Sequence, residues 1–238
     1  MENRILLYQS ELSVCSYLES QQSSNQIIDP FTRLTPALYG MLLEKGFRRS
    51  GEMVYRPNCP TCSQCLSTRI IVDQFTPRRI QKRSWKRVVE QLQVLPGEPV
   101  FKQQHYDLYK KYTERRHTDG DMSNASPEEY MGFLNCRWSH TEFVELRLGT
   151  RLMAVAVTDR QPDSLSAVYT FFDPELSHLS PGVISVLAQV ELAKSRRLPW
   201  LYLGYWIKDS GKMSYKSNFR PIQMLKNDRW TLFEHEQK

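Results

Sequence analysis

Residues 201–216 read Leu-Tyr-Leu-Gly-Tyr-Trp-Ile-Lys-Asp-Ser-Gly-Lys-Met-Ser-Tyr-Lys, and this stretch predicts a buried strand that ends in a polar loop. Apolar residues alternate from Leu201 to Ile207, which is the period of a strand. Gly204 lies inside the strand, where glycine usually marks a bulge or a close approach to the backbone. The loop combines aromatic rings with cations, which favours contact with bases and phosphates, although a plain solvated loop has a similar composition.

The elements before this stretch predict a mixed sheet. Strands are predicted at 143–148, 152–157 and 166–172, and the short turns between them indicate an antiparallel meander. A helix from about Pro181 to Arg197 follows, and it precedes the strand at 199–207. Antiparallel strands, a helix and a further central strand fit an acetyltransferase-like fold, and the same order also fits other α+β sheets.

A domain boundary is predicted near residues 74–100, with a small cysteine-bearing module before it and the sheet domain after it. Helix start signals occur at Thr35-Pro36 and at Ser126-Pro127, and a further helix is predicted from Phe101 to Arg116. A Pro- and Gly-containing loop lies at 96–99. We therefore predict a cysteine-bearing module at 1–75 and a catalytic mixed-sheet domain at 76–238.

The composition is that of an ordinary globular chain. The 238 residues are 40% hydrophobic and 24% charged, and no apolar run approaches the roughly 20 residues that span a bilayer. The polar first residues do not resemble a signal peptide. We expect a cytoplasmic protein without a membrane partner, whose five cysteines are reduced thiols or metal ligands.

A basic run predicts contact with a polyanion. The formal net charge is +6, and the stretch 78–87 holds six cations and no acid: Arg78, Arg79, Lys82, Arg83, Lys86 and Arg87. In a helix these residues would share one side, where like charges destabilise each other. A solvated helix face is the ordinary explanation of such a run, but the missing carboxylates favour phosphate binding, for which Arg78, Arg79, Lys82 and Arg83 are the candidates.

Three cysteines form a possible metal site. Cys59, Cys62 and Cys65 have C-x₂-C-x₂-C spacing, and Cys15 could complete a set of four. Four thiolates suit zinc, and similar spacing occurs in iron–sulfur proteins. Reduced structural thiols are the equally weighted alternative.

A second charged cluster lies at 114–122. It contains Arg115, Arg116, His117, Asp119 and Asp121. Arginines can grip a carboxylate bidentately, and a histidine can relay a proton near neutral pH. A helix end with favourable cations followed by an Asp-Gly turn explains the same residues without a function.

Four motifs together resemble one family. They are the 202–207 string with Lys-Met-x-Tyr-Lys at 212–216, Gly-Phe-Arg-Arg-Ser-Gly at 46–51 with Tyr-Arg-Pro-Asn-Cys at 55–59, Arg-His-Thr-Asp-Gly-Asp-Met at 116–122, and Leu-Ser-Ala-Val-Tyr-Thr-Phe-Phe-Asp-Pro at 165–174. Spread over nearly the whole chain, they resemble the aminoacyl-tRNA–protein transferases, in particular the bacterial aspartate/glutamate leucyltransferases, which are relatives of the arginyl-tRNA–protein transferases.

The resemblance implies a fold and a reaction. The fold is an acetyltransferase-like (GNAT-type) sheet domain with a cysteine-bearing module. The reaction moves leucine from leucyl-tRNA to the N-terminal Asp or Glu of an acceptor protein, which marks that protein for N-degron degradation. The aminoacyl ester is already activated, so no cofactor is required. An arginyl donor, a non-catalytic RNA-binding protein and an acetyl-CoA-dependent transferase are the alternatives.

Site roles follow from the same resemblance. His117 or Asp209 is a candidate proton acceptor, alongside the terminal hydroxyl of the tRNA, and Tyr205 is a further catalytic candidate. Tyr205 and Trp206 would form the wall of the aminoacyl pocket. The predicted contacts to the tRNA acceptor end are Lys212, Tyr215 and Lys216, and the predicted acceptor-protein site is Arg115, Arg116, Asp119 and Asp121. Eukaryotic relatives carry a cysteine-bound cluster, which implies zinc or an iron–sulfur cluster as a possibility here.

Overall fold

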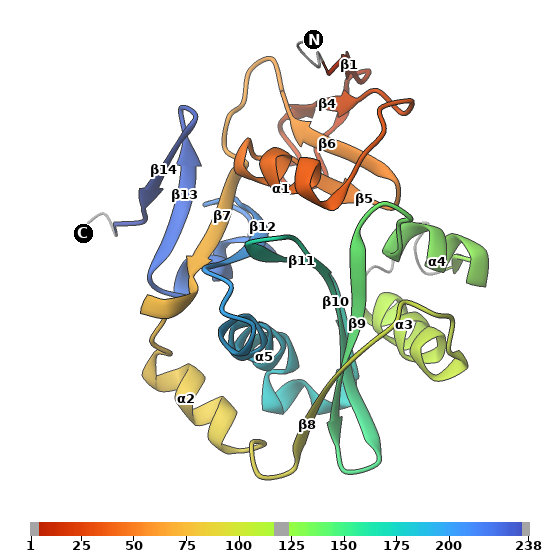
Figure 1. Ribbon diagram of the computed structural model, residues 1–238, viewed down its shortest axis with the longest axis vertical. Helices are drawn as coiled ribbons and strands as arrows, with labels where there is room; N and C mark the ends of the chain where they lie inside the picture. The colour runs from red at the N-terminus through yellow and green to blue at the C-terminus, as the bar shows by residue number, and fades with distance from the viewer. Residues whose placement is uncertain (1–4, 117–123, 235–238) are drawn as a thin grey trace.

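The computed structural model describes residues 5–116 and 124–234, and Figure 1 shows a large curved sheet with a smaller sheet above it. The described elements, in chain order, are β1 (Leu7–Gln9), β2 (Ser13–Val14), β3 (Gln22–Ser23), β4 (Asn25–Ile28), α1 (Pro36–Glu44), β5 (Arg48–Ser50), β6 (Met53–Pro57), β7 (Leu66–Ile71), η1 (Val72–Gln74), α2 (Arg79–Lys86), β8 (Leu92–Gly97), α3 (Gln103–Arg116), α4 (Pro127–Leu134), β9 (His140–Leu148), β10 (Arg151–Arg160), β11 (Ser164–Phe172), η3 (Pro174–Leu179), α5 (Pro181–Ser195), β12 (Trp200–Trp206), η4 (Ser214–Asn218), β13 (Ile222–Lys226) and β14 (Arg229–Leu232).

The large sheet has eight strands in the order β14-β13-β7-β12-β11-β10-β9-β8. Strands β9, β10 and β11 form the antiparallel meander that the sequence predicts. Strand β12 pairs in parallel with β11 and antiparallel with β7, and α5 makes the crossover that a parallel pair needs. The fold class is therefore α+β with a mostly antiparallel mixed sheet, as predicted.

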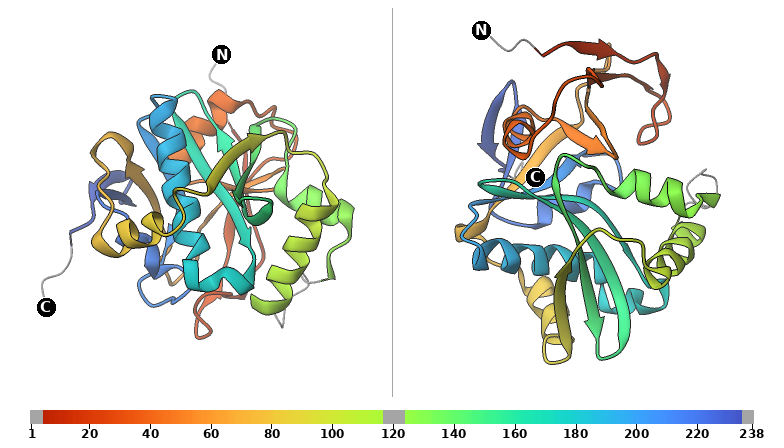
Figure 2. Two further views of the ribbon diagram at one scale, coloured as in Figure 1. Left: turned by 90° about the horizontal axis from the view of Figure 1, so that it is seen from below. Right: turned by 45° about the vertical axis from the view of Figure 1, so that its right-hand side comes forward.

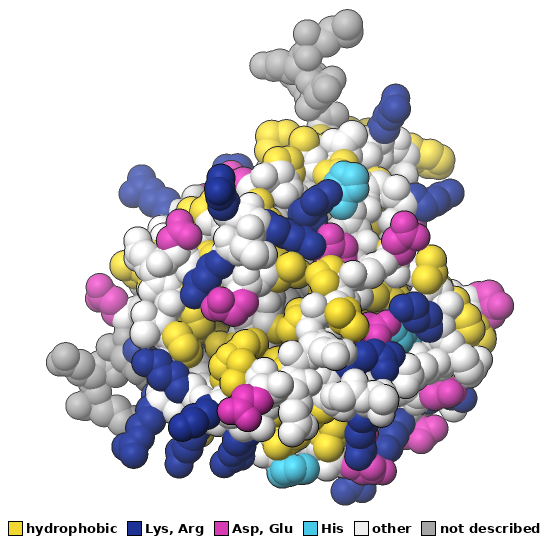
Figure 3. All heavy atoms as spheres, turned by 60° about the horizontal axis from the view of Figure 1, so that its bottom comes forward, with side chains coloured by type: hydrophobic (Ala, Val, Ile, Leu, Met, Phe, Trp, Pro, Cys, Tyr) yellow, Lys and Arg dark blue, Asp and Glu magenta, His cyan; other side chains and the backbone are white. Residues whose placement is uncertain are grey.

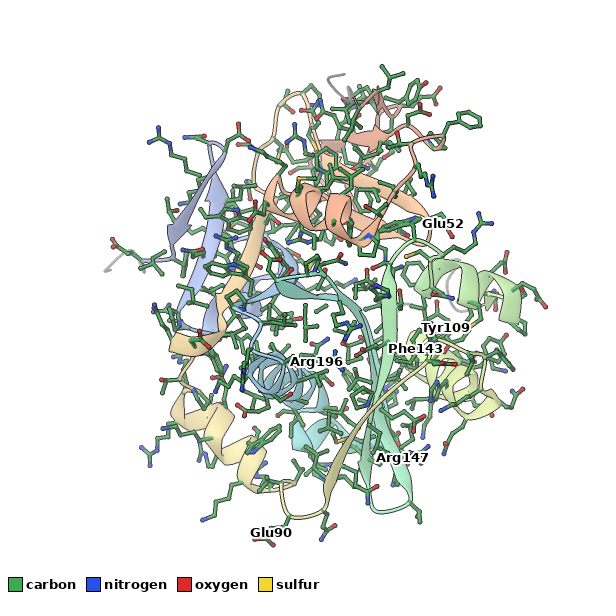
Figure 4. All side chains as sticks on the ribbon, in the orientation of Figure 1. Glu52, Glu90, Tyr109, Phe143, Arg147 and Arg196 are labelled. Carbon is green, nitrogen blue, oxygen red and sulfur yellow. The ribbon has the colours of Figure 1, made fainter. Side chains whose placement is uncertain are left out.

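Helices cover both faces of this sheet, as Figure 2 shows. On one face, Leu187 and Val190 of α5 pack with Leu201 of β12 in a core that also includes Trp85 of α2. On the other face, Tyr109 of α3 lies in a core with Phe143 of β9, and both are labelled in Figure 4. The two cores hold the strands between two helical layers.

The small sheet has the order β1-β4-β6-β5 and packs against α1. Thr35 caps this helix and Pro36 is its first residue, which confirms the predicted helix start. Tyr39 and Leu43 of α1 are fully buried in a core that includes Tyr202 of β12. The small sheet is thus packed directly on the central strand of the large one.

A buried ion pair adds a second link between the sheets. Arg49 of β5 donates from Nε to Oδ2 of Asp159 of β10 at 2.6 Å, and both side chains are fully buried. A second donor of the same guanidinium bonds to Leu134, Thr141 and the other Asp159 oxygen. An exposed pair between Arg137 and Glu52, of which Glu52 is labelled in Figure 4, also links the small sheet to the segment after α4.

Strand β7 bears on the predicted division of the chain at residue 75. Strand β7 lies before that residue, yet it pairs with β12 and β13 inside the large sheet. The small sheet and α1 lie entirely before residue 58. Strand β7 therefore shares the hydrogen bonds and the core of the large sheet. The domain boundary at residue 75 remains a prediction.

Glu145 of β9 makes the large sheet sensitive to acid. Burial alone would raise the pKa of Glu145, but hydrogen bonds from Lys102, Arg147 and His105 outweigh it and lower the pKa to about 2. A carboxylate with a lowered folded-state pKa stabilises the fold above its unfolded-state pKa, and this stability disappears as the pH falls through the folded-state value.

We expect wild-type protein to lose about 2–3 kcal/mol of unfolding free energy through Glu145 as the pH falls from about 4.5 to about 2. Glu145→Gln should be less stable at pH 7 and should show a flatter pH dependence in this range. Urea unfolding at a series of pH values measures the free energy of unfolding at pH 7 and its dependence on pH. Parallel curves for the two proteins would contradict the assignment.

Candidate active site

The site predicted at 201–216 is built around a bulge in β12. The pairing of β12 with β7 shifts register between Tyr202 and Gly204, and Gly204 has φ of +81°, a conformation that favours glycine. A Cβ atom placed on Gly204 would meet the Nζ atom of Lys216 at 3.5 Å. The predicted bulge is confirmed, and the group that approaches the backbone there is a lysine of the following loop.

Strands β11 and β12 separate after a short parallel contact. Their pairing ends at Ser166 and Tyr202, although β11 continues for six residues and β12 for four. Residues 167–170 of β11 are only half-buried although β11 is a central strand. Beyond this last pair, β11 and β12 no longer form ladder hydrogen bonds with each other. Backbone N–H groups left in this way can stabilise an oxyanion.

Tyr205 is held beneath the small sheet. The side chain is 6% exposed, and its hydroxyl donates to the carbonyl oxygen of Gly46 at 2.9 Å. Burial is the main cause that raises the pKa of Tyr205 well above its usual value. This engaged hydroxyl suits positioning of the small sheet on β12.

Lys216 differs from the other cations of the loop because it is buried. It is 6% exposed, and its Nζ donates to the carbonyl oxygen of Tyr205 at 2.6 Å. Burial, followed by the charge of Arg48, lowers the pKa of Lys216 to about 7. Lys212 and Asp209 are exposed on the same loop. Lys216 is therefore a buried cation, unlike Lys212, and its predicted contact with the tRNA acceptor end stays a prediction.

The two aromatic candidates of this segment lie around the same loop. Trp206 is half-buried, its indole N–H donates to the carbonyl oxygen of Ser214, and its ring lies 5.4 Å from that of Phe233. Tyr215 is 43% exposed, and its ring contacts Phe219 edge-on. Tyr215 thus offers an aromatic face to solvent, whereas Trp206 supports the loop from within.

Arg48 joins the site from β5. It is 6% exposed, and it donates to the hydroxyl of Ser67 at 2.6 Å and to the carbonyl oxygen of Phe47 at 2.8 Å. Its guanidinium carbon lies 5.2 Å and 5.7 Å from the ring centres of Tyr202 and Tyr205, which is cation–π distance. Sequence reasoning did not single out Arg48, although it lies in the 46–51 motif, where two adjacent arginines were the available signal.

The basic run forms helix α2, and its cations are exposed. All six are on the surface, and the helix begins beside η4, where Arg78 bonds to the side chain of Asn218 and Gln81 donates to its carbonyl oxygen at 3.2 Å. The structure therefore brings the basic helix and the 208–218 loop together. Figure 3 shows basic side chains around exposed hydrophobic surface on the lower face of the molecule.

A groove between α2 and α5 combines hydrophobic surface with basic side chains. Its volume is about 370 Å³, and it is lined by Phe75, Pro77, Lys82, Trp85, Lys86, Val89, Leu187 and Glu191. Apolar side chains form most of this lining, and lysines stand at its side. An aromatic and aliphatic floor with adjacent cations suits a stacked base whose phosphate lies near the lysines.

The second charged cluster lies at the end of α3. Arg115 is exposed beside a hollow of about 410 Å³, whose other lining residues are Lys111, Glu114, Pro174 and Glu175. Arg116 ends the helix, and His117, Asp119 and Asp121 lie outside the described residues. Arg115 thus belongs to α3, whereas Lys216 belongs to η4.

The four candidate metal ligands lie near one another without forming a metal site. Burial, followed by the charges of Cys59, Cys15 and Cys62, raises the pKa of Cys65 to about 12, so the four thiols are close enough to interact. Yet no group of three His, Cys, Asp or Glu side chains among residues 5–116 and 124–234 is arranged to hold an ion. The donor types suit zinc or an iron–sulfur cluster, but this geometry does not, and no step below depends on a metal.

Elemental analysis decides the cysteine hypothesis. Metal binding by Cys15, Cys59, Cys62 and Cys65 predicts zinc or iron at about one equivalent or more in protein purified without chelator. A Cys62→Ser variant should then lose most of that metal. Metal-free wild-type protein with full activity would establish these residues as reduced thiols.

Within the described residues, no helix is both long and apolar enough to cross a membrane.

Two family models match the chain. The model described as "Arginine-tRNA-protein transferase, N terminus" covers residues 13–83, and "Arginine-tRNA-protein transferase, C terminus" covers residues 104–226, more than half of the chain. The chain belongs to the arginine-tRNA-protein transferase family. The bulged strand β12 and the part of α2 up to Arg83 lie within the matched residues, whereas the rest of α2 lies between the two matched ranges.

Curated members of the family are similar over almost the full length. The chain is 44% identical to "Aspartate/glutamate leucyltransferase" of Pseudomonas fluorescens (strain Pf0-1) over 96% of this chain and 97% of that protein. It is 46% identical to the protein of the same name from Alcanivorax borkumensis over 91% and 89% of the two chains.

Solved structures are more distant from this transferase. The structure of L-PGS from Bacillus licheniformis matches 65% of this chain and 51% of that chain with a TM-score of 0.47 and 11% identity. A C-terminal domain of a putative lysylphosphatidylglycerol synthetase from Agrobacterium fabrum matches 60% of this chain and 47% of that chain, with a TM-score of 0.45 and 10% identity.

Proposed function

We propose that the protein transfers leucine from leucyl-tRNA to the α-amine of an N-terminal Asp or Glu on an acceptor protein, and so creates a destabilising N-terminus for N-degron degradation. Nearly full-length relatives named aspartate/glutamate leucyltransferase carry the assignment of both substrates. The arginyl-tRNA–protein transferase reaction is the second candidate, favoured by the description of the family models.

The reaction is an aminolysis of an ester. The α-amine attacks the ester carbonyl of leucyl-tRNA, the bond to the ribose oxygen breaks, and the terminal hydroxyl of the tRNA leaves with a proton from the amine. The ester is already activated, so alignment of the amine and stabilisation of the oxyanion supply the rate enhancement. Backbone donors where β11 and β12 separate are our candidates for the oxyanion contact.

We propose that the large sheet acts as an acetyltransferase-like (GNAT-type) platform for this step. The parallel β11–β12 pair that opens after three residue pairs supports this, because backbone groups beyond the last pair are left free to contact a substrate. Asp209 is a proton-acceptor candidate that is exposed on the loop after β12. His117 has the same proposed role from the segment after α3.

The tRNA would lie along α2 and the 208–218 loop. Arg78, Arg79, Lys82 and Arg83 are exposed along this surface, and Lys212 and Tyr215 are exposed next to η4. Exposed cations neutralise phosphates while the aromatic ring stacks on a base. Trp206 would then support the wall of the aminoacyl pocket. For the acceptor protein, the end of α3 with Arg115, Arg116, Asp119 and Asp121 is the site that the sequence proposes.

One assay separates the candidate functions. Purified protein is mixed with an Asp-starting peptide and, in separate reactions, with leucyl-tRNA, arginyl-tRNA or acetyl-CoA. We expect the peptide to gain leucine from leucyl-tRNA alone. Gain of arginine supports the second candidate, and acetylation would support an acetyl-CoA-dependent transferase. RNA binding without any transfer would identify a non-catalytic RNA-binding protein.

A further inference from the structure

Two buried cations lie beside the β12 bulge without an acidic partner. Arg48 and Lys216 are each only 6% exposed, and neither forms an ion pair with any residue in 5–116 or 124–234. The contrast with Arg49 is informative, because this neighbouring buried guanidinium holds Asp159. A buried charge without a counter-charge costs folding free energy, so a purely structural role would favour an apolar residue at either position.

The contacts of Lys216 place its ammonium at the bulge. Its Nζ donates to the carbonyl oxygen of Tyr205 at 2.6 Å and lies 3.4 Å from the sulfur of Met213. These are neutral acceptors, and the ammonium has a third N–H to donate. Gly204 leaves the backbone beside this ammonium uncovered, since any side chain there would occupy the space 3.5 Å from Nζ.

The contacts of Arg48 bring its guanidinium to the same place. It donates to the hydroxyl of Ser67 and lies near the carbonyl oxygen of Thr68. In the sheet, Ser67 is the register partner of Tyr205 and Thr68 that of Gly204. The buried Nε of Arg48 has no hydrogen-bond partner among the described residues. Both cations therefore converge on the Gly204–Tyr205 segment with donors left over.

We propose that Arg48 and Lys216 bind the side-chain carboxylate of the N-terminal Asp or Glu of the acceptor protein. This inference rests on the proposed function and assigns its acceptor selectivity to the β12 bulge instead of the end of α3. A carboxylate supplies the missing counter-charge and accepts from both cations. The α-amine of the same residue is a few bonds from this carboxylate, and Gly204 and Tyr205 come shortly after Tyr202, the last residue of β12 that pairs with β11.

A phosphate of the tRNA is the competing anion for this site. The exposed cations of α2 already form a surface for phosphates, and such contacts are typically made at the surface. A buried cation pair instead gives selectivity, because a ligand without the charge leaves the cations unpaired. The burial of Arg48 and Lys216 therefore favours the carboxylate.

The test measures kcat/KM for leucine transfer onto two peptides that differ only in the first residue, Asp or Asn. We expect wild-type protein to prefer Asp by roughly a hundredfold. Lys216→Met should reduce this ratio by roughly tenfold or more, with little change on the Asn peptide and unchanged affinity for leucyl-tRNA. Lys216→Arg keeps the charge and should retain most of the preference. Lys226→Met, an exposed lysine on β13, is the matched control and should keep the wild-type ratio.

Melting temperature provides the folding readout. Lys216→Met should melt at or above the wild-type temperature, because methionine removes a buried charge that has no acidic partner. An unchanged Asp-to-Asn ratio in Lys216→Met overturns the proposal, as does a loss of tRNA affinity with the ratio intact, which would assign the site to phosphate. Arg116→Ala is assayed in parallel, and a collapse of the ratio there alone would return selectivity to α3. A wild-type protein that transfers leucine to neither peptide refutes the proposed function itself.

Discussion

Replacing Arg49 with methionine is expected to lower the free energy of unfolding by about 3–5 kcal/mol. Arg49 and Asp159 are both fully buried, and the variant leaves the carboxylate without its cation in the interior. Thr141 still donates to Asp159 at 2.7 Å, but one hydroxyl does not replace a bidentate guanidinium. Because the pair joins β5 to β10, the same variant should also loosen the small sheet on the large one and reduce transfer activity.

Urea denaturation of the wild type and three variants tests this expectation. Arg49→Met with Asp159→Leu removes both charges and should recover most of the lost stability. Arg137→Met is the control for an exposed ion pair of the small sheet, since the Arg137 side chain is 91% exposed, and it should cost less than about 1 kcal/mol. Equal losses in Arg49→Met and Arg137→Met would contradict the role assigned to the buried pair.

The second large effect concerns the tRNA binding that we propose for α2. Alanine at Arg78, Arg79, Lys82 and Arg83 removes four exposed cations without touching the core. If each neutralises one phosphate, the slope of log affinity against log salt should flatten by about three to four. Between about 50 and 200 mM salt, wild-type affinity should then fall roughly a hundredfold more than that of the variant.

Filter binding of leucyl-tRNA across this salt range measures the slope. The matched control replaces four other exposed cations, Lys45, Arg160, Lys226 and Arg229, and should keep the wild-type slope. An unchanged slope in the α2 variant would make the helix a solvated face. Equal flattening in both variants would show that binding depends on overall charge and not on this surface.

The local elements were predictable because their signals are local. The alternation in residues 143–172 sets the strand faces, and Thr35 and Ser126 have the side-chain oxygens that cap a helix. The place of β7 between β12 and β13 was not predictable, because it depends on contacts such as Arg69 with Tyr202, which are 133 residues apart. Local sequence signals therefore do not reveal which strands are the neighbours of β7 in the sheet.

The site was predictable in composition but not in arrangement. The sequence showed Lys216 as one cation of a polar loop, and only the fold shows that it turns inward against Gly204. The pair Arg48 and Arg49 looked alike in sequence. In the short strand β5 they reach different parts of the large sheet, so one arginine holds Asp159 and the other lies beside the bulge without an acid.

The most direct test of the central claim follows the leucyl group onto the acceptor. Wild-type protein is incubated with leucyl-tRNA and an Asp-starting peptide, with either a free or an acetylated α-amine, and the products are sequenced by mass spectrometry. We expect a single leucine at the N-terminus of the free peptide and none on the blocked peptide. Leucyl-tRNA that remains charged while the free peptide stays unmodified would contradict the account.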